Sequence, residues 1–521
     1  MGAAEQHIKD AKLTKLKPES VSTSIPDYEV LIIGAGISGM AAAIELKRRG
    51  IESFQILERA DDVGGTWRDN NYPGIAVDIM SFVYTYSFEQ NPDWSRLYAP
   101  GAELKRYMRK VACKYGLYRS TRFGVVVNSA EFDESKSLWR VNTNQGFFTA
   151  RHLTSAVGSL VEPKKPTIRG IDDFQGKCMH TARWDQDYDL TGKRVALIGT
   201  GATGVQVVPE IAEQVEHLDV YQRTPIWIIP KPDARTPFWL RTLFRLSSTA
   251  QKGMRLSTHA LTELVMVVGV TYFKQMPWLV RMLENVCLKN LHKQLPEQPD
   301  LWKKLTPKYG FGCKRPTFSN EYFKTFSRDN VELVTDSIDC ITASGIKTKD
   351  GKEREIDVLI LATGFEVFGK KSFPTYPVLG RGGIDLREYW YTNRYQAFEG
   401  LTVPGYPNFY MFMGPYALTA TSYFVMAEGN AVHMARCVEE ARKRGAEVVE
   451  VKQEVHDRYF EEIQKRQQST VFLNNNCGDS SSYYFDHHGD APLARPSTSM
   501  EMLLRAKYLS MDNYRFIRGN R

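Results

Sequence analysis

Two glycine-rich turns of this chain have the residue types and the spacing that hold a pyrophosphate. The glycines are Gly34, Gly36 and Gly39 in the first turn, and Gly199, Gly201 and Gly204 in the second. Glycine lets the backbone approach a phosphate closely, and the free N–H groups at the start of the following helix donate to it. One such motif is a weak signal. Here each copy follows an apolar run and precedes a small-residue helix start, so a dinucleotide is expected at both.

The residue at the end of the next strand separates the two turns. Nineteen residues beyond the last glycine of the first turn stands Glu58, followed by Arg59. A carboxylate there accepts bonds from an unmodified ribose, as in FAD. At the same distance beyond the second turn stands Arg223, followed by Thr224. An arginine there favours a ribose 2′-phosphate, which predicts NADPH, although a surface arginine without a ligand is the alternative.

Each turn must be positioned by a strand before it and a helix after it. Residues 28–33 and 194–198 are apolar runs of strand length, and residues 40–49 and 205–214 have the composition of helices. A strand, a glycine turn and a helix together make the nucleotide-binding unit of parallel α/β proteins. The sequence therefore predicts an α/β fold with two Rossmann-like dinucleotide-binding domains.

Composition shifts along the chain predict where these domains begin and end. Prolines at 163 and 166 mark a linker, residues 236–300 are apolar at helical spacing, and the strand-like run 357–362 ends in Ala-Thr-Gly. We expect an N-terminal extension over 1–26 and an FAD-binding domain built from 27–165 and 345–521. An NADPH-binding domain over 166–344 carries a helical insertion at about 236–300. The chain is expected to return to the first domain near Gly345.

The bulk composition excludes several classes of function. The 521 residues predict roughly three globular units. A formal charge of +8, with 68 basic residues interspersed among 60 acidic ones, makes nucleic acid an unexpected partner. The N-terminus lacks the apolar region of a secretory signal. The most apolar stretch, residues 264–272, is too short to span a membrane and predicts a buried or interfacial helix.

The cysteines predict a reduced, cytoplasmic protein without a metal site. They are scattered and include no Cys-x-x-Cys pair, which argues against zinc-ribbon or thioredoxin-type chemistry. We therefore expect seven buried structural thiols, at Cys113, Cys178, Cys287, Cys313, Cys340, Cys437 and Cys477.

Two dinucleotides in one chain allow a hydride to pass from a nicotinamide to a flavin, so the predicted chemistry is redox. Three further segments resemble motifs of the type I Baeyer-Villiger monooxygenases, within the wider flavin-containing monooxygenase group. Residues 174–185 resemble the fingerprint Phe-x-Gly-x-x-x-His-x-x-x-Trp, residues 64–67 followed by Asp78 resemble a second motif, and residues 357–364 a third. The resemblance spans nearly the whole chain. It implies cofactor contacts by Gly65, Thr66, Trp67, His180 and Trp184.

The segment Lys314-Arg315-Pro316 carries the most specific part of this resemblance. It implies that Lys314 binds the 2′-phosphate and that Arg315 is the active-site arginine, oriented by Asp78. The oxygenating species of the family is a C4a-peroxyflavin, which attacks as an anion and leaves an anionic adduct. A fixed guanidinium stabilises both anions. The resemblance further implies that NADP+ stays bound, with contacts from Thr200, Thr203 and Gln206.

The resemblance therefore implies an NADPH-dependent flavoprotein monooxygenase that converts ketones and O2 into esters or lactones. The tryptophan at 184 favours ketone oxidation, because the sister N- and S-oxygenating enzymes typically have Tyr or Phe there. Two alternatives stay open: an N- or S-monooxygenase, and a flavin-binding sensor or scaffold without turnover. The sequence predicts neither the ketone nor the oligomeric state, and a monomer remains open.

The chain departs from the family pattern in a C-terminal loop. Some members carry a tryptophan after Gly-Asp-Ser, whereas Ser481 follows that tripeptide here. Tyr483 and Tyr484 are the candidates to take its place.

Overall fold

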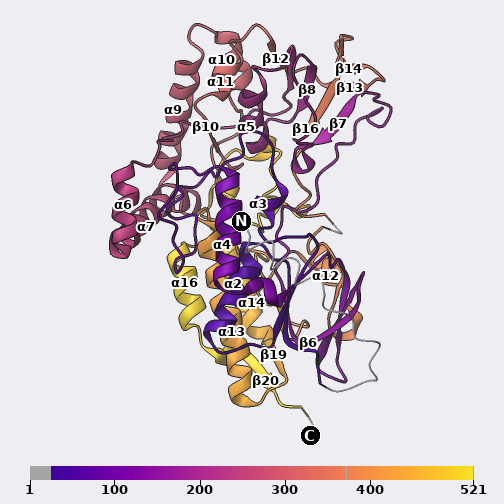
Figure 1. Ribbon diagram of the computed structural model, residues 1–521, viewed down its shortest axis with the longest axis vertical. Coiled ribbons are helices and arrows are strands. Elements are labelled where there is room, and N and C mark those ends of the chain that lie inside the picture. Colours follow the sequence, from indigo (N-terminus) through magenta and orange to yellow (C-terminus); the bar gives the residue numbers. More distant parts are fainter. Residues whose placement is uncertain (1–24, 370–371, 520–521) are drawn as a thin grey trace.

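The computed structural model describes residues 25–369 and 372–519, so almost all of the predicted N-terminal extension lies outside the described residues. Two separate sheets form the framework. The sheet in the lower half of Figure 1 is mixed, and the sheet in the upper half is parallel. The lower sheet has the order β17 (Val378–Leu379), β4 (Val127–Asp133), β5 (Leu138–Thr143), β6 (Gly146–Ser155), β1 (Tyr28–Ile33), β2 (Phe54–Glu58) and β3 (Thr121–Phe123), and β18 (Phe409–Met411) also pairs with β6.

Strand β1 lies in the middle of this sheet because its residues are apolar on both faces. It pairs in parallel with β2 and with β6, in the register Val30 opposite Phe54 and His152. Helices cover the sheet: α2 (Ile37–Arg48) and the long α13 (Tyr423–Arg444) pack together, with α3 (Thr66–Asp69), α4 (Gly101–Lys114) and η1 (Leu117–Ser120) nearby. The first glycine turn therefore rests on a rigid, buried frame.

The upper sheet is entirely parallel, in the order β12 (Val331–Val334), β9 (His217–Tyr221), β8 (Arg194–Ile198), β16 (Val358–Leu361) and β7 (Lys177–His180). Helices α5 (Ala202–Ile211) and α11 (Tyr322–Thr325) pack beside it. A small antiparallel sheet of β13 (Ile338–Ile341), β14 (Gly345–Thr348) and β15 (Glu353–Glu355) lies beside β16 and β8 in Figure 1. Strand β7 begins at residue 177, after the predicted proline linker.

The predicted return to the first domain near Gly345 is wrong. Strand β16 pairs with β7 and β8 in the upper sheet, and the next strand of the lower sheet is β17 at Val378. The chain therefore crosses back only after Leu361. The apolar pattern of a fully buried strand is the same in either sheet, so it did not indicate which sheet β16 joins.

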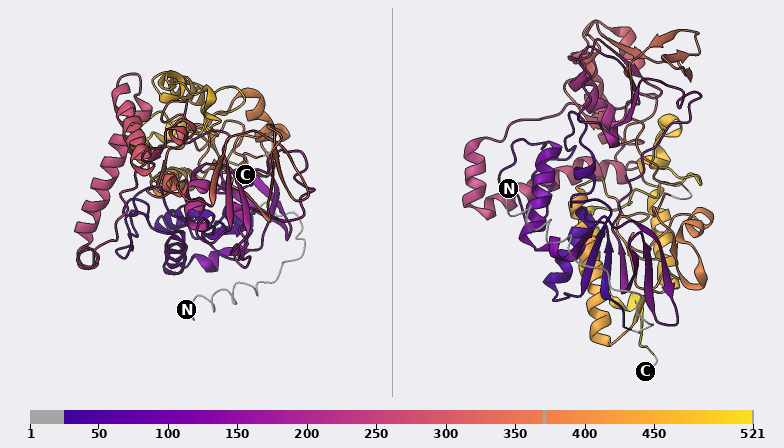
Figure 2. Two further views of the ribbon diagram at one scale, coloured as in Figure 1. Left: turned by 90° about the horizontal axis from the view of Figure 1, so that it is seen from above. Right: turned by 45° about the vertical axis from the view of Figure 1, so that its right-hand side comes forward.

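The predicted helical stretch lies between two short paired strands, β10 (Ile228–Ile229) and β11 (Thr317–Phe318). It contains α6 (Phe238–Leu246), α7 (Ser248–Thr262), the π-helical turn η3 (Glu263–Val268), α8 (Gly269–Thr271), α9 (Pro277–Gln294) and α10 (Pro299–Leu305). Helices α6 and α7 stand out from the left edge of the molecule in Figure 1 and in the right panel of Figure 2. Among the described residues, no helix is both long and apolar enough to cross a membrane.

The C-terminal part of the chain adds the remaining helices and strands of the lower half. Its elements are η4 (Arg381–Gly383), α12 (Leu386–Asn393), β19 (Val448–Val451), α14 (Gln453–Gln467), α15 (Val471–Asn474), η5 (Gly478–Ser480), α16 (Ser499–Tyr508), η6 (Met511–Asn513) and β20 (Tyr514–Ile517). Helix α16 lies below α7 at the left edge of Figure 1. At the start of α16, the hydroxyl of Ser499 forms a hydrogen bond of 2.8 Å with the Nε2 atom of His259 in α7.

Candidate active site

The first glycine turn is shaped to leave its helix start open. Gly34 has φ +102°, and a Cβ there would lie 2.8 Å from the carbonyl oxygen of Ala156. Gly36 is the N-cap of α2, and no side chain caps it. Gly65 lies against Gly36, where a Cβ on Gly36 would lie 3.6 Å from the Cα of Gly65. The N–H groups at the start of α2 therefore face a cradle bounded by backbone, which fits the pyrophosphate of FAD.

Glu58 closes β2 beside this turn and is almost fully buried. One carboxylate oxygen accepts from the backbone N–H of Ala35 at 2.8 Å, and the other accepts from that of Ala60 at 2.9 Å. Arg68 lies 3.0 Å from the same carboxylate. Arg59, in contrast, is partly exposed and pairs loosely with Asp69 and Glu162, at 3.6 Å each. Glu58 is thus held at the strand end where a ribose would lie.

One cavity of about 500 Å³ joins the two glycine turns. This volume is in the range of small-molecule and cofactor sites. Of the predicted site residues, its wall contains Gly34, Gly36, Glu58, Arg59, Gly65, Thr66, Trp67, Asp78, Thr203, Gln206 and Arg315. The cavity therefore brings residues of the lower and upper halves of the molecule together, as a shared hydride-transfer cleft requires.

The second glycine turn repeats the first in backbone form. Gly199 has φ +113°, and a Cβ there would lie 2.4 Å from the carbonyl oxygen of Ala362. Gly201 caps α5 without a side-chain bond, and a Cβ on it would have no neighbour within 4 Å. The hydroxyl of Thr200 donates to the carbonyl oxygen of Thr224 at 3.1 Å, which fixes the turn to the segment after β9. The open face over Gly201 fits a second pyrophosphate.

Gln206 of α5 connects the two halves. Its amide nitrogen donates to the carbonyl oxygen of Ala76 at 3.0 Å, and its amide oxygen accepts from the hydroxyl of Tyr72 at 3.0 Å. Tyr72 was not among the predicted site residues. The Tyr-Pro-Gly turn of residues 72–74 is the sequence signal that marks it.

Lys314 and Arg223 form a pair of like charges. Burial, and to a smaller extent the positive charge of Arg223, lower the pKa of Lys314 to about 8. An anion bound beside both cations would stabilise the charged form of Lys314. Arg223 is exposed two residues beyond the end of β9, where the ribose of the second dinucleotide is expected. The pair therefore fits a 2′-phosphate, which distinguishes NADPH from NADH.

Arg315 and Asp78 form a two-pronged ion pair. The guanidinium Nε donates to one carboxylate oxygen of Asp78 at 2.7 Å, and a terminal nitrogen donates to the other at 2.9 Å. The negative charge of Asp78 raises the pKa of Arg315 well above its ordinary value. About 30% of each side chain stays exposed, 31% for Arg315 and 29% for Asp78, because both line a cavity. Arg315 is therefore a permanent, oriented cation.

A second, apolar cavity of about 270 Å³ meets the first at this ion pair. Asp78 and Arg315 line both cavities. The rest of the smaller cavity is largely aliphatic and aromatic, with Ile79, Ile229, Leu261, Val265, Val270 and Phe472 among its lining residues. A cation at the end of an apolar space can polarise a carbonyl group while its neighbours exclude water.

Two tyrosines cover the other side of Arg315. Tyr484 lines the smaller cavity and Tyr483 the larger one. Burial raises the pKa of Tyr484, whereas Arg315 lowers it both by its charge and by a hydrogen bond. The two rings lie 5.1 Å apart. The loop in which the family tryptophan is absent thus brings both candidate tyrosines to the arginine.

A disulfide between Cys313 and Cys477 ties this loop to the residue before Lys314. The prediction of reduced, buried thiols is wrong for this pair, and it is also wrong for Cys113 and Cys178, which are exposed. The two partners are 164 residues apart in sequence. They meet because the backbone N–H of Gly310 donates to the carbonyl oxygen of Asn476 at 2.9 Å. Cys287 and Cys437 are buried free thiols, and Cys340 is partly buried.

His180 and Trp184 lie outside the walls of both cavities. His180 ends β7, and its Nδ1 accepts from the backbone N–H of Ala182 at 3.1 Å, at the start of η2 (Thr181–Arg183). Its Nε2 lies 3.3 Å from the hydroxyl of Thr363. Burial lowers the pKa of His180. Trp184 packs on the core of the upper sheet. Both residues are placed where the chain enters that sheet.

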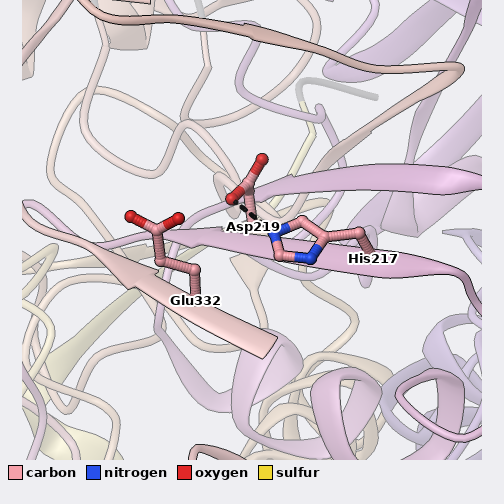
Figure 3. Close-up of side chains that lie close together, drawn as sticks. All are labelled: His217, Asp219 and Glu332. Carbon is pink, nitrogen blue, oxygen red and sulfur yellow. Dashed lines mark hydrogen bonds and ion pairs between the residues drawn. The ribbon is translucent and has the colours of Figure 1, made fainter. Parts of the chain in front are cut away.

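A cluster of His217, Asp219 and Glu332 could in principle hold a metal ion (Figure 3). The His217 Nε2 lies 3.2 Å from a carboxylate oxygen of Asp219, whose pKa burial raises. Arg354 of β15 donates to Glu332 at 2.6 Å and lies 3.7 Å from Asp219. Arg354 therefore contacts both carboxylates where a metal ion would lie, and the cluster attaches the small antiparallel sheet to β9 and β12.

Comparisons with known proteins agree with this site. The family model described as pyridine nucleotide-disulphide oxidoreductase matches residues 31–273. A Baeyer-Villiger monooxygenase of Pseudomonas aeruginosa is 39% identical over 451 residues, which cover 86% of this chain and 84% of that protein. A steroid monooxygenase structure bound to NADP has a TM-score of 0.82 at 29% identity, covering 95% of this chain and 100% of that one.

A structure of OTEMO in complex with FAD and NADP has a TM-score of 0.82 at 28% identity, covering 94% of this chain and 98% of that one. A Baeyer-Villiger monooxygenase of Streptomyces coelicolor is 34% identical, over 94% of this chain and 92% of that protein. Long, nearly complete matches at this identity, together with the two glycine turns and their shared cavity, show that the chain belongs to the Baeyer-Villiger monooxygenases, which are flavoprotein oxidoreductases.

Proposed function

We propose that this chain uses FAD and NADPH to insert one atom of O2 beside the carbonyl group of an uncharged ketone, with Arg315 as the catalytic residue. The observation that supports this most directly is the Arg315–Asp78 ion pair, at the point where the large polar cavity and the small apolar cavity meet. The flavin, when bound and reduced by NADPH, supplies the activated oxygen.

Arg315 stabilises the negative charge that develops on the carbonyl oxygen of the substrate during attack. A guanidinium has five N–H donors in a fixed plane. Asp78 accepts from only two nitrogens of Arg315, so the remaining donors point elsewhere. Asp78 is a positioning residue, since it fixes the plane of the guanidinium and raises its pKa. The cation is therefore charged at every pH at which the enzyme is folded.

The apolar lining sets the class of substrate and keeps water away. A cavity of about 270 Å³ with few polar groups besides Arg315 and Asp78 suits a ketone with an aliphatic or aromatic body. The charged residues of the lining include two arginines, Arg315 and Arg495, so a cationic substituent would be desolvated beside other cations. Binding of cationic ketones is therefore disfavoured.

The variant Arg315→Ala tests the assignment. Removing one oriented donor for a developing anion typically lowers turnover by about 10²–10³. We expect ketone oxidation to fall by at least this factor, while NADPH still reduces the flavin under anaerobic conditions. The matched control is Arg169→Ala, which removes an exposed arginine that pairs with Asp339 and lines neither cavity.

Two outcomes would change the proposal. Ketone oxidation at the control rate in Arg315→Ala would refute the role of Arg315. Sulfide oxidation that survives in this variant, with no ketone oxidation in the parent enzyme on a panel of cyclic, linear and aryl ketones, would favour the N- or S-monooxygenase alternative.

A further inference from the structure

An unusual share of exposed apolar side chains gathers on the helices between β10 and β11. Of the 21 large hydrophobic side chains that are exposed among the described residues, ten lie within residues 238–282. They are Phe238, Trp239, Leu243, Leu246, Leu256, Leu261, Leu264, Tyr272, Trp278 and Met282. Single exposed hydrophobic residues are normal on soluble proteins, but a gathered group marks an interaction surface.

These side chains follow the outer faces of the helices. Helix α6 buries Phe244 and exposes Trp239 by 66% and Leu246 by 83%. Helix α7 buries Gln251, Arg255 and Thr258, whereas Leu256 (64%) and, in η3, Leu264 (60%) are exposed. Helix α7 thus turns three polar side chains inward beside Met254, while Leu256 and Leu261 are exposed on its outer side.

Helix α16 extends the same surface. Met500, Leu504 and Tyr508 lie four residues apart along the helix, and all three are exposed by half or more. The start of α16 is fixed to α7 and η3, because Ser499 bonds both His259 and Glu263. Figure 1 and the right panel of Figure 2 show α6 and α7 on one edge of the molecule, with α16 below α7 in Figure 1. We call these exposed side chains of residues 238–282 and α16 the apolar edge.

The exposed charged side chains of residues 235–282 are all basic. Residues 235–282 contain seven lysines and arginines and a single acidic residue, Glu263. Glu263 points inward and accepts from Ser499 of α16. Lys252, Lys274 and Arg281 are exposed, and within the described part of the chain no carboxylate pairs with them. Basic residues between Trp, Phe and Leu are the pattern of a helix that lies in the interface of an anionic membrane.

A second copy of this chain fits the apolar edge less well than an anionic membrane does. In a two-fold dimer the same surface faces itself, so the unpaired cations of one copy would approach those of the other. Like charges brought together at an interface oppose association. An anionic lipid surface, by contrast, pairs the cations with phosphate groups while the apolar side chains enter the acyl region.

We infer that the apolar edge docks this protein onto the surface of a bilayer that contains anionic phospholipid, with α6, α7 and α16 lying in the interface. The helices are placed on the membrane and do not span it. The small apolar cavity adjoins this surface, since Leu261 is 51% exposed on α7 and also lines that cavity, together with Thr262 and Val265. Docking would therefore deliver lipid-dissolved ketones directly to Arg315.

Only the entry route rests on the proposed function. The docking itself needs no turnover, so it can be measured on the FAD-loaded protein without a substrate. The experiment is flotation of this holoprotein with vesicles of phosphatidylcholine alone and with vesicles that also contain phosphatidylglycerol. We expect the protein to float with the vesicles that contain phosphatidylglycerol and to stay behind with phosphatidylcholine alone.

Two variants separate the apolar and the electrostatic contributions. Trp239→Ser combined with Leu246→Ser should weaken binding by about tenfold or more, because both side chains would lose their place in the acyl region. Lys252→Glu combined with Lys274→Glu should remove the preference for phosphatidylglycerol. The matched control is Phe147→Ser, which removes a side chain that is 61% exposed on β6 in the lower sheet. All five substituted positions are exposed, and an unchanged flavin spectrum reports that each variant is folded.

Three results would overturn the inference. If the parent protein floats with neither kind of vesicle, a membrane is excluded as the partner. If Trp239→Ser/Leu246→Ser and Phe147→Ser lose vesicle binding to the same extent, the contact with the membrane is not specific to the apolar edge. A parent protein that is dimeric by light scattering and becomes monomeric in Trp239→Ser/Leu246→Ser shows that the apolar edge joins two copies instead. If flotation succeeds but ketone oxidation is absent, the docking stands and the proposed function fails.

Discussion

The two glycine turns have nearly the same backbone, yet the structure completes them differently. At the first turn, Glu58 comes from the strand next to the turn, and two backbone N–H groups and Arg68 hold its carboxylate. At the second turn, Arg223 is exposed, and its partner cation Lys314 comes from a segment about a hundred residues further along the chain. We therefore expect the backbone of a turn to set where a pyrophosphate lies, and the side chains at the strand end to set which dinucleotide is bound.

The largest expected effect tests how tightly each turn is packed. In Gly39→Ala, the new Cβ would lie 1.8 Å from the carbonyl oxygen of Gly34, so the first turn cannot keep its form. We expect destabilisation by more than about 3 kcal/mol, or loss of FAD. Gly204, the equivalent position in the second turn, is packed in the same way, with a Cβ 2.3 Å from the carbonyl oxygen of Gly199. Gly201→Ala is the contrasting change, because a Cβ at that position meets nothing within 4 Å.

Gly201→Ala should leave the melting temperature and the FAD content unchanged while it raises the KM for NADPH, because only the ligand approaches this position. Thermal unfolding and flavin absorbance measure the first two, and steady-state kinetics the third. Equal melting temperatures for Gly39→Ala and the parent protein would show that the first turn is not packed as described.

The next effect tests the paired cations of the second turn. Lys314→Ala or Arg223→Ala removes one charged hydrogen bond to the 2′-phosphate, worth about 1.5–3 kcal/mol. We expect the KM for NADPH to rise by about tenfold or more, while the KM for NADH stays the same. Arg328→Ala, which removes an exposed arginine paired with Glu213 near β12, serves as the control. A parallel rise in both KM values would mean that the two cations only support the fold.

A smaller, graded effect follows from the lowered pKa of Lys314. Because this pKa is about 8 in the folded protein, the charge that binds the phosphate is lost as the pH rises above 8. The KM for NADPH should then increase by up to about tenfold per pH unit, and Lys314→Arg should abolish the increase, since arginine stays charged. The same shift makes the free energy of unfolding rise with pH between about 8 and 10.5, because the unfolded chain keeps the proton longer.

The measurement is a pH profile of KM for NADPH in the parent enzyme and in Lys314→Arg. Profiles that bend at the same pH in both proteins would assign the titration to another group.

The smallest effect concerns the disulfide behind Lys314. We expect five free thiols, not seven, when the protein is denatured and titrated without reductant. In Cys477→Ser the KM for NADPH should change by less than about threefold, because the N–H of Gly310 still bonds Asn476 and the amide of Asn475 still reaches the carbonyl oxygen of Phe311. A count of seven thiols would contradict the pairing.

Much of the framework could be predicted from sequence because it depends on local pattern. Apolar strands, glycine turns and the residues at fixed distances beyond them are short-range features, and the family and the α/β fold are confirmed. The contacts of the individual site residues with FAD and NADPH stay predictions. The predicted return of the chain to the FAD-binding domain near Gly345 was wrong, because the sequence of a buried strand such as β16 does not indicate which strands it pairs with.

The cysteines show the same limit. Cys313 and Cys477 are brought together by contacts between two loops, and nothing within either segment indicates the other. The approach of Tyr483 and Tyr484 to Arg315 is also a long-range outcome. Their position in a loop that differs from the family pattern gave the only signal.

Lys314 and Arg315 are consecutive residues, so a single peptide unit separates the side chain that we propose for the cofactor phosphate from the one that we propose for the carbonyl group of the substrate. Neither can shift along the chain without carrying the other. The guanidinium of Arg315 keeps its own partner, because Asp78 holds it by two hydrogen bonds that do not involve Lys314. A backbone shift at this segment would therefore disturb both proposed roles, whereas a change of nucleotide would disturb only the contact of Lys314.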